Sequence, residues 1–191
     1  MRTTAALVAG AGVSLAAYVV ARPWGPGDTP QGWAAASWPV THALAMLGFV
    51  LLAAASQRLA AARPARGVVP LAWATVGLLL PYYGAEAFAL HAIGTTGVAN
   101  SAEVATAIRF GPIQAVAFLA GWVALAALGI VLAVAVTRGT TDRVLRVGTW
   151  ALAAGLALYF PVFYLPPAGR VTHGVLVAVA ALVTAWRLRR A

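Results

Sequence analysis

The residue in this sequence that is best placed to do chemistry is Glu86, within the segment from Pro81 to His91. It belongs to an apolar run from Val68 to Ala92, and it is the only carboxylate in any such run of the chain. Insertion of an acidic side chain at the middle of a bilayer costs roughly 2.5–3.5 kcal/mol of free energy. Such a residue is therefore expected where it is paired, hydrated or functional. Glu86 is therefore the first candidate for a functional residue.

Two tyrosines share the helix face of Glu86. Tyr82 and Tyr83 lie about 40° and 60° from it around a helix axis, close enough for a hydroxyl to donate to the carboxylate or pass it a proton. A carboxyl group withdrawn from water suits a general acid, a general base or a proton carrier. The alternative is a structural ion pair between Glu86 and Arg109 or Arg170, which would hold helices together.

The three histidines are predicted at the same end of the helices as Glu86, together with Arg109 and Arg170. Cations in these positions favour an anionic partner, such as Glu86, a lipid headgroup, or a phosphate or carboxylate on a ligand. The predicted catalytic residues are Tyr82, Tyr83, Glu86 and His91, and the predicted substrate-binding residues are Arg109, Gln114 and Arg170.

The histidines also suggest a metal site. Three neutral imidazoles, from His42, His91 and His173, suit zinc with one open position, where Glu86 would activate a bound water. Alternatively His42 and His173, each in a Val-Thr-His sequence at a helix start, would ligate haem. The chain has no cysteine, which excludes thiolate ligands and disulfides.

The elements that position these residues are transmembrane helices. Of 191 residues, 62% are hydrophobic and 9% are charged, with a mean hydropathy of +0.88. A soluble domain has about 25% charged residues. The sequence therefore predicts an all-α, polytopic integral membrane bundle that forms one membrane domain over residues 1–191.

Six segments approach the ~20 residues that a helix needs to cross a bilayer. They are residues 4–21, 38–56, 68–92, 112–136, 144–164 and 168–186, with a short interfacial helix at 101–109. The first is longer than a signal-peptide core and is interpreted as a retained helix. Residues 22–37, rich in Pro, Gly and Trp, predict an interfacial loop. Pro81 is expected to kink the third helix and Pro161 to bend the fifth.

Orientation follows from the arginines, which supply all 13 basic side chains. Ten fall on one side of the six predicted helices, namely Arg2, Arg58, Arg63, Arg66, Arg138, Arg143, Arg146, Arg187, Arg189 and Arg190. Only Arg22, Arg109 and Arg170 fall on the other side. The positive-inside rule then places both termini in the cytoplasm, in the cell membrane of a bacterium to judge by a composition without lysine. Because the arginines flank apolar runs, nucleic-acid binding is set aside, and the lipid bilayer is the expected partner.

Three functions follow from this pattern. The first is a small membrane enzyme that acts on a lipophilic substrate by acid–base chemistry at Glu86, in the outer half of the bilayer. The second is the histidine-ligated zinc or haem protein. The third is a proton-coupled carrier that uses Glu86 as coupling group, although the inner half offers no polar lining. A scaffold subunit whose polar residues contact a partner is a further alternative.

Overall fold

The computed structural model describes residues 1–23, 29–63 and 65–190, and it confirms the all-helical fold. Five helices are long and apolar enough to cross a membrane, which indicates a multi-pass membrane protein. They are α1 (Arg2–Ala21), α3 (Ser37–Ala62), the continuous helix Val68–Thr96, α7 (Pro112–Thr137) and α9 (Pro167–Leu188). These bounds agree with five of the six predicted segments to within six residues.

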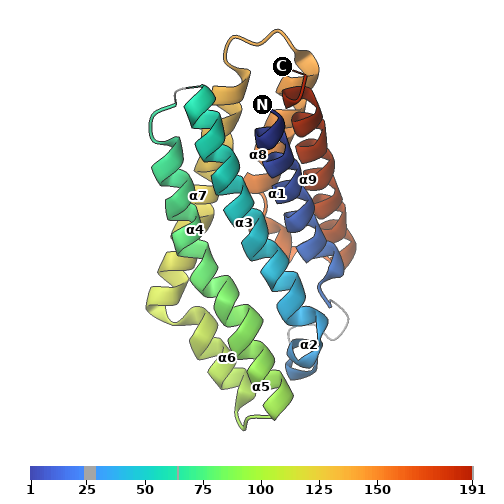
Figure 1. Ribbon diagram of the computed structural model, residues 1–191. Helices are drawn as coiled ribbons and strands as arrows, with labels where there is room; N and C mark the ends of the chain where they lie inside the picture. The colour runs from blue at the N-terminus through green and yellow to red at the C-terminus, as the bar shows by residue number, and fades with distance from the viewer. Residues whose placement is uncertain (24–28, 64, 191) are drawn as a thin grey trace.

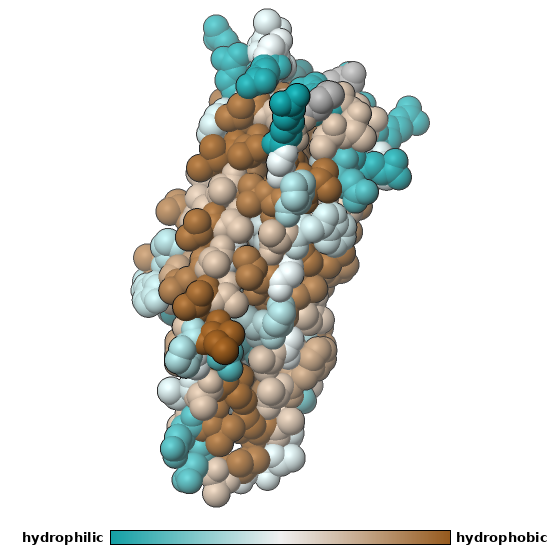
Figure 2. All heavy atoms as spheres, turned by 90° about the vertical axis from the view of Figure 1, so that its left-hand side faces the viewer, coloured by the Kyte–Doolittle hydropathy of each residue, from teal (hydrophilic) through white to brown (hydrophobic). Residues whose placement is uncertain are grey.

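The long helices and α8 (Arg143–Ala157) form a closed ring. Around it, α1 packs between α3 and α9, α4 (Val68–Gly84) packs between α3 and α7, and α8 packs between α7 and α9. Both termini lie at the same end of the bundle (Figure 1). Figure 2 shows hydrophobic residues over the middle of one face and hydrophilic residues gathered at the end that holds the termini.

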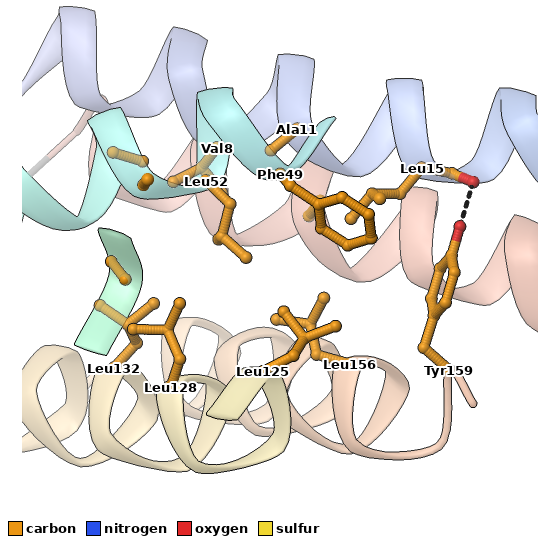
Figure 3. Close-up of a cluster of buried hydrophobic side chains, with 14 of the residues drawn as sticks. Val8, Ala11, Leu15, Phe49, Leu52, Leu125, Leu128, Leu132, Leu156 and Tyr159 are labelled. Carbon is orange, nitrogen blue, oxygen red and sulfur yellow. Dashed lines mark hydrogen bonds between the residues drawn. The ribbon is translucent and has the colours of Figure 1, made fainter. Parts of the chain in front are cut away.

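Apolar side chains fill the inside of this ring. Leu15 and Phe49 from α1 and α3 point toward Leu125, Leu128 and Leu156 from α7 and α8 (Figure 3). At one edge of this core the Tyr159 hydroxyl donates to the Leu15 carbonyl at 2.8 Å, which satisfies a buried polar group. The centre of the bundle is therefore a packed apolar core.

The fifth predicted helix, 144–164, is shorter than expected. Helix α8 ends at Ala157, and a separate 3-10 turn, η2, covers Pro161–Tyr164. Pro161 explains this ending, because its ring would clash with the carbonyl of Ala157 in a continued helix. Pro161 thus ends the helix where the sequence predicted only a bend, and α8 alone is shorter than the ~20 residues of a crossing.

The third predicted helix is longer than expected. It continues through Pro81 as α4, widens into a π-helical turn, η1 (Ala85–Leu90), and ends as α5 (His91–Thr96). Single π turns inside α-helices are frequent at functional sites. The 29 residues of this helix span about 44 Å, more than the ~30 Å of a hydrocarbon core.

The far end of this helix belongs to a distal lobe, made of α2 (Pro30–Ala34), η1, α5 and α6 (Ser101–Phe110). Helix α6 confirms the predicted short helix at 101–109. The loop predicted at 22–37 contains α2, while residues 24–28 lie outside the described part of the chain. Gly94 permits the close contact of α2 with α5, because a Cβ there would lie 2.6 Å from the Pro30 carbonyl oxygen.

Candidate functional site

Glu86 lies at a cavity of about 250 Å³ between the distal lobe and the bundle, here called the Glu86 cavity. The residues that line it come from α1, α4, η1, α6, α7 and the segment around η2. They are Tyr18, Arg22, Tyr82, Tyr83, Glu86, Arg109, Phe110, Phe118, Phe160, Phe163 and Tyr164. Its walls are mainly aromatic, and its charged groups are one carboxylate and two guanidiniums.

The segment that follows α8 forms part of the wall of the Glu86 cavity. Because the helix stops at Ala157, the following segment brings Phe160, Phe163 and Tyr164 to the cavity. The side chains of Phe110 and Tyr164 are 66% and 79% exposed, while Tyr83 and Glu86 are buried. The cavity therefore extends from exposed aromatic residues at its rim to buried polar residues inside.

The π turn fixes the backbone at Glu86. Its carbonyl oxygen accepts a hydrogen bond from Trp38 Nε1 at 2.6 Å, which ties η1 to the start of α3. Both residues are buried, so this bond satisfies a donor and an acceptor that have no access to bulk water.

The carboxylate of Glu86 forms a buried, bidentate ion pair with Arg109. Arg109 Nε lies 2.6 Å from Oε1, and the NH2 group of Arg109 donates to Oε2 at 2.9 Å. The guanidinium also lies over the Trp33 ring, 5.3 Å from its centroid. Of the two arginines that the sequence offered as partners of Glu86, the structure selects Arg109.

His42 lies on the other side of the same carboxylate. Its Nδ1 is 2.7 Å from the Trp38 carbonyl oxygen, and since a carbonyl only accepts, Nδ1 carries the hydrogen. Its Nε2 is 3.7 Å from Glu86 Oε2 and has no hydrogen-bond partner among the described residues. With 1% of its surface exposed, His42 is sealed behind the cavity.

Arg22 is a second guanidinium at the cavity. Its NH1 group donates to the Tyr18 hydroxyl at 2.9 Å, and the guanidinium lies 4.7 Å from the centroid of the Trp38 ring. From the sequence, Arg22 was used only to predict the topology. A basic residue just after an apolar run is the ordinary pattern of a helix end, so nothing local distinguished it as a site residue.

The two predicted tyrosines both reach the cavity. Tyr82 stacks on Phe118 of α7 with ring centroids 3.8 Å apart, and Tyr83 is 2% exposed and contacts the rings of Tyr18 and Phe49. The structure therefore brings Tyr82, Tyr83, Glu86 and Arg109 together, as the sequence predicted.

Three other predicted residues lie elsewhere. Arg170 donates through Nε to the Leu165 carbonyl, and it is not among the residues lining the cavity. Gln114 is exposed and packs its amide against Gly111, beside α6. His91 contacts the Trp33 carbonyl through Nδ1 at 2.7 Å and so holds α5 to α2. These side chains stabilise turns and helix contacts outside the cavity.

The predicted three-histidine metal site does not form. His42, His91 and His173 each pair with a different backbone carbonyl, the last with Gly155 at 2.9 Å. Within the described residues, no three His, Cys, Asp or Glu side chains are grouped so that they could hold a metal ion. Haem ligation by His42 and His173 does not fit either, because Nε2 of His42 faces a buried carboxylate and Nε2 of His173 is engaged by Gly155.

No protein-family model, curated protein sequence or solved structure matches this chain. The assignment of a function therefore rests on the geometry of the Glu86 cavity.

Proposed function

We propose that this protein is a small integral-membrane enzyme that moves a proton on a lipophilic substrate, with Glu86 as the base. The observation that supports this most is the contact between Glu86 Oε2 and His42 Nε2, at 3.7 Å. An ionised carboxylate and a neutral imidazole nitrogen without hydrogen are both acceptors. Buried side by side, they make a place for one proton.

The cavity fits a lipophilic molecule that develops negative charge. Its aromatic walls suit an apolar body, and Phe110 and Tyr164 at the rim are exposed where such a molecule would arrive. The guanidiniums of Arg22 and Arg109 would stabilise an anion formed beside Glu86. A substrate of this class has an apolar ring or chain next to a polar group that acidifies a neighbouring bond.

The proposed step balances without another reactant. Glu86 takes a proton from the substrate, whose electron pair stays on the substrate as an anion next to the guanidiniums. The proton rests on Glu86 or passes to His42 Nε2, which then pairs as imidazolium with the carboxylate. Return of the proton to a different atom of the substrate completes an isomerisation. A positioned acid or base of this kind contributes about 10²–10⁴-fold to the rate.

The proposal includes the topology. The chain forms one membrane domain that crosses a bacterial cell membrane six times, with α8 and η2 together making the sixth crossing. The arginine-rich end and both termini face the cytoplasm, by the positive-inside rule. Glu86 lies about 27 Å along its helix from Val68, which supports a position of the cavity near the outer surface of the hydrocarbon core.

A proton-coupled carrier is less well supported. A carrier needs a polar path to the opposite side, and the space between the two ends is filled by the apolar core that includes Leu52, Leu125 and Leu128. The enzyme needs access from one side only, which the position of the cavity supplies.

Deuterium transfer tests the proposal without a known substrate. The purified protein is incubated in D₂O with total lipid extracted from the membranes of its host, the lipids are returned to H₂O, and carbon-bound deuterium is measured by mass spectrometry. We expect one lipophilic species to gain deuterium with the wild type and with Glu103→Gln, which changes an exposed carboxylate on α6. We expect Glu86→Gln to slow labelling at least 10²-fold.

The controls make the outcome decisive. Glu86→Gln keeps an oxygen for Arg109, and circular dichroism and thermal unfolding establish that the variant is folded. Labelling that is the same in a folded Glu86→Gln variant, or no labelled species in the whole extract, would contradict the proposal.

A further inference from the structure

A second cavity lies at the opposite end of the molecule, between the turn that joins α3 to α4 and the end of α7. It measures about 750 Å³, and we call it the arginine groove. Three guanidiniums and a short apolar wall line it: Arg63, Ala65, Arg66, Val131, Val134, Ala135, Arg138, Gly139 and Thr140. No carboxylate is among these residues.

Arg63 has a fixed place in this groove. Its NH1 group donates to the Val136 carbonyl at 2.5 Å, and Val136 is one residue before the last residue of α7. The last carbonyls of a helix lack intrahelical partners and carry the negative end of the helix dipole. Arg63 therefore joins α3 to α7 and offsets the dipole, which makes the groove more favourable for an anion.

Among the described residues, the carboxylate at this end of the bundle is already paired. Of the acidic residues that the structure describes, Asp142 lies at the end of the bundle with the arginine groove, and Glu86 and Glu103 lie in the distal lobe. Arg187 already contacts Asp142 Oδ2 through Nε at 2.8 Å and NH2 at 2.6 Å, and the Leu145 amide donates to Oδ1. The guanidiniums of Arg63, Arg66 and Arg138 therefore face a groove that is lined by no carboxylate, and they are available to an anion from outside the chain.

The shape of the groove distinguishes a lipid from a free ion. Val134 and Val131 of α7 lie about one and two turns before Arg138, which directly follows the helix, so the apolar wall extends about 10 Å from the guanidiniums toward the middle of the bundle. Val134 is 40% exposed and Val131 is half-buried. A phosphate beside the guanidiniums would continue into an acyl chain along these valines. Inorganic phosphate would leave that wall uncovered.

We propose that the arginine groove is a binding site for the phosphate of an anionic phospholipid, such as phosphatidylglycerol. Basic pockets between transmembrane helices on the cytoplasmic side are a recognised form of lipid site. Arg66 and Arg138 are exposed and supply the charge, while Arg63 is positioned by Val136. The site is separate from the Glu86 cavity and does not depend on the chemistry proposed there.

Native mass spectrometry of the protein in detergent, titrated with phosphatidylglycerol or phosphatidylcholine, tests this proposal. The wild type should retain phosphatidylglycerol in preference to phosphatidylcholine. Arg66→Gln with Arg138→Gln should weaken phosphatidylglycerol binding about tenfold or more, given the contribution of each arginine near a membrane surface. The matched control is Arg2→Gln with Arg189→Gln, which removes the same charge at the same end but outside the groove.

Each other outcome overturns the proposal. An equal loss in the control pair would mean that binding follows net charge alone. Equal retention of the two lipids would remove the role of the guanidiniums. Displacement of phosphatidylglycerol by millimolar inorganic phosphate would identify a free anion as the occupant. Because Arg66 and Arg138 are exposed, the variant should fold, and the single change Arg66→Gln tests the same point more mildly.

Discussion

Nε2 of His42 lies 3.7 Å from Oε2 of Glu86, while Nδ1 of the same ring is held by the Trp38 carbonyl at 2.7 Å. The second contact fixes which nitrogen carries hydrogen, and the first then brings a bare nitrogen close to a carboxylate oxygen. The two groups can bond only through a proton or another donor placed between them. This contact with Glu86 distinguishes His42 from His91 and His173, which pair with the carbonyls of Trp33 and Gly155.

His42→Phe tests that role. The variant keeps a ring in the buried site but removes the Nε2 lone pair, so deuterium transfer should slow by about 10- to 100-fold, less than for loss of Glu86. The fold should persist, because the Trp38 carbonyl still accepts from the Thr41 hydroxyl at 3.0 Å. A labelling rate unchanged from that of the wild type would restrict His42 to a structural role.

Because Glu86 and Arg109 form a buried ion pair, we expect the loss of one charge to destabilise the protein more than the loss of both. Arg109→Gln leaves a buried carboxylate without its cation and should destabilise the protein by about 3–5 kcal/mol. Removing both charges, with Glu86→Gln and Arg109→Gln together, should restore much of that loss. Thermal unfolding in detergent measures the difference, and a double variant no more stable than Arg109→Gln would argue against a desolvated pair.

Trp38→Phe tests the bond from the indole to the Glu86 carbonyl. The change keeps an aromatic ring but removes the donor at 2.6 Å, and the loss of one buried hydrogen bond costs about 0.5–1.5 kcal/mol. Amide hydrogen exchange should rise in Ala85–Leu90. Trp73→Phe is the matched control, since Trp73 is 44% exposed on α4. Equal effects of the two changes would mean that ring packing, rather than the hydrogen bond, is responsible.

Two glycines should respond differently to alanine. At Gly12 a Cβ would lie 2.1 Å from the Ala181 Cβ, so Gly12→Ala must separate α1 from α9, at about 1–3 kcal/mol. At Gly77 nothing lies within 4 Å, and Gly77→Ala should be neutral or slightly stabilising because alanine favours helix. The unfolding temperatures of the two variants measure this. Similar values would contradict the close approach of α1 and α9.

Asp142 makes stability depend on pH in the acid range. The Leu145 amide, which bonds its carboxylate, and the nearby Arg187 hold the pKa of Asp142 below its ordinary value. A lowered folded-state pKa contributes stability above the unfolded pKa of about 3.9, and this contribution is lost as the pH falls through the folded value. The unfolding temperature should therefore drop below about pH 4, and Asp142→Asn should remove that part of the drop. If the unfolding temperature of Asp142→Asn fell by the same amount at acid pH, the pH dependence would come from other groups.

Much of the helical framework could be predicted from the sequence. Apolar runs of bilayer length gave five long helices, and the arginines marked the end that holds both termini. The local rules were wrong at one of two prolines. At Pro161 the helix ended, while at Pro81 it continued and formed the π turn that carries Glu86. A proline limits the backbone, but the packing around it decides between these results.

The site was predicted in part. Glu86 was predicted as a site residue because it is a charged residue within an apolar run, and Tyr82 and Tyr83 were predicted because helix geometry puts them on the same face. His42 was predicted as one of three histidines and not as the neighbour of Glu86, and Arg22 and Trp38 were missed, because contacts between helices decide which side chains meet at the cavity. Arg170 and Gln114 do not line the Glu86 cavity for the same reason, since depth in the membrane says nothing about direction around the bundle.

The sequence by itself determined that the chain is helical, that it is apolar enough for a membrane, and that one carboxylate is unusual. Those properties depend on local composition and on the cost of burying charge. Only the tertiary structure decided which arginine neutralises Glu86 and which imidazole faces it. It also decided that the three histidines stay apart, because contacts between helices depend on how each is rotated and where it bends. In a chain so rich in alanine, valine and leucine, many rotations bury similar apolar surface, and the few polar contacts distinguish among them.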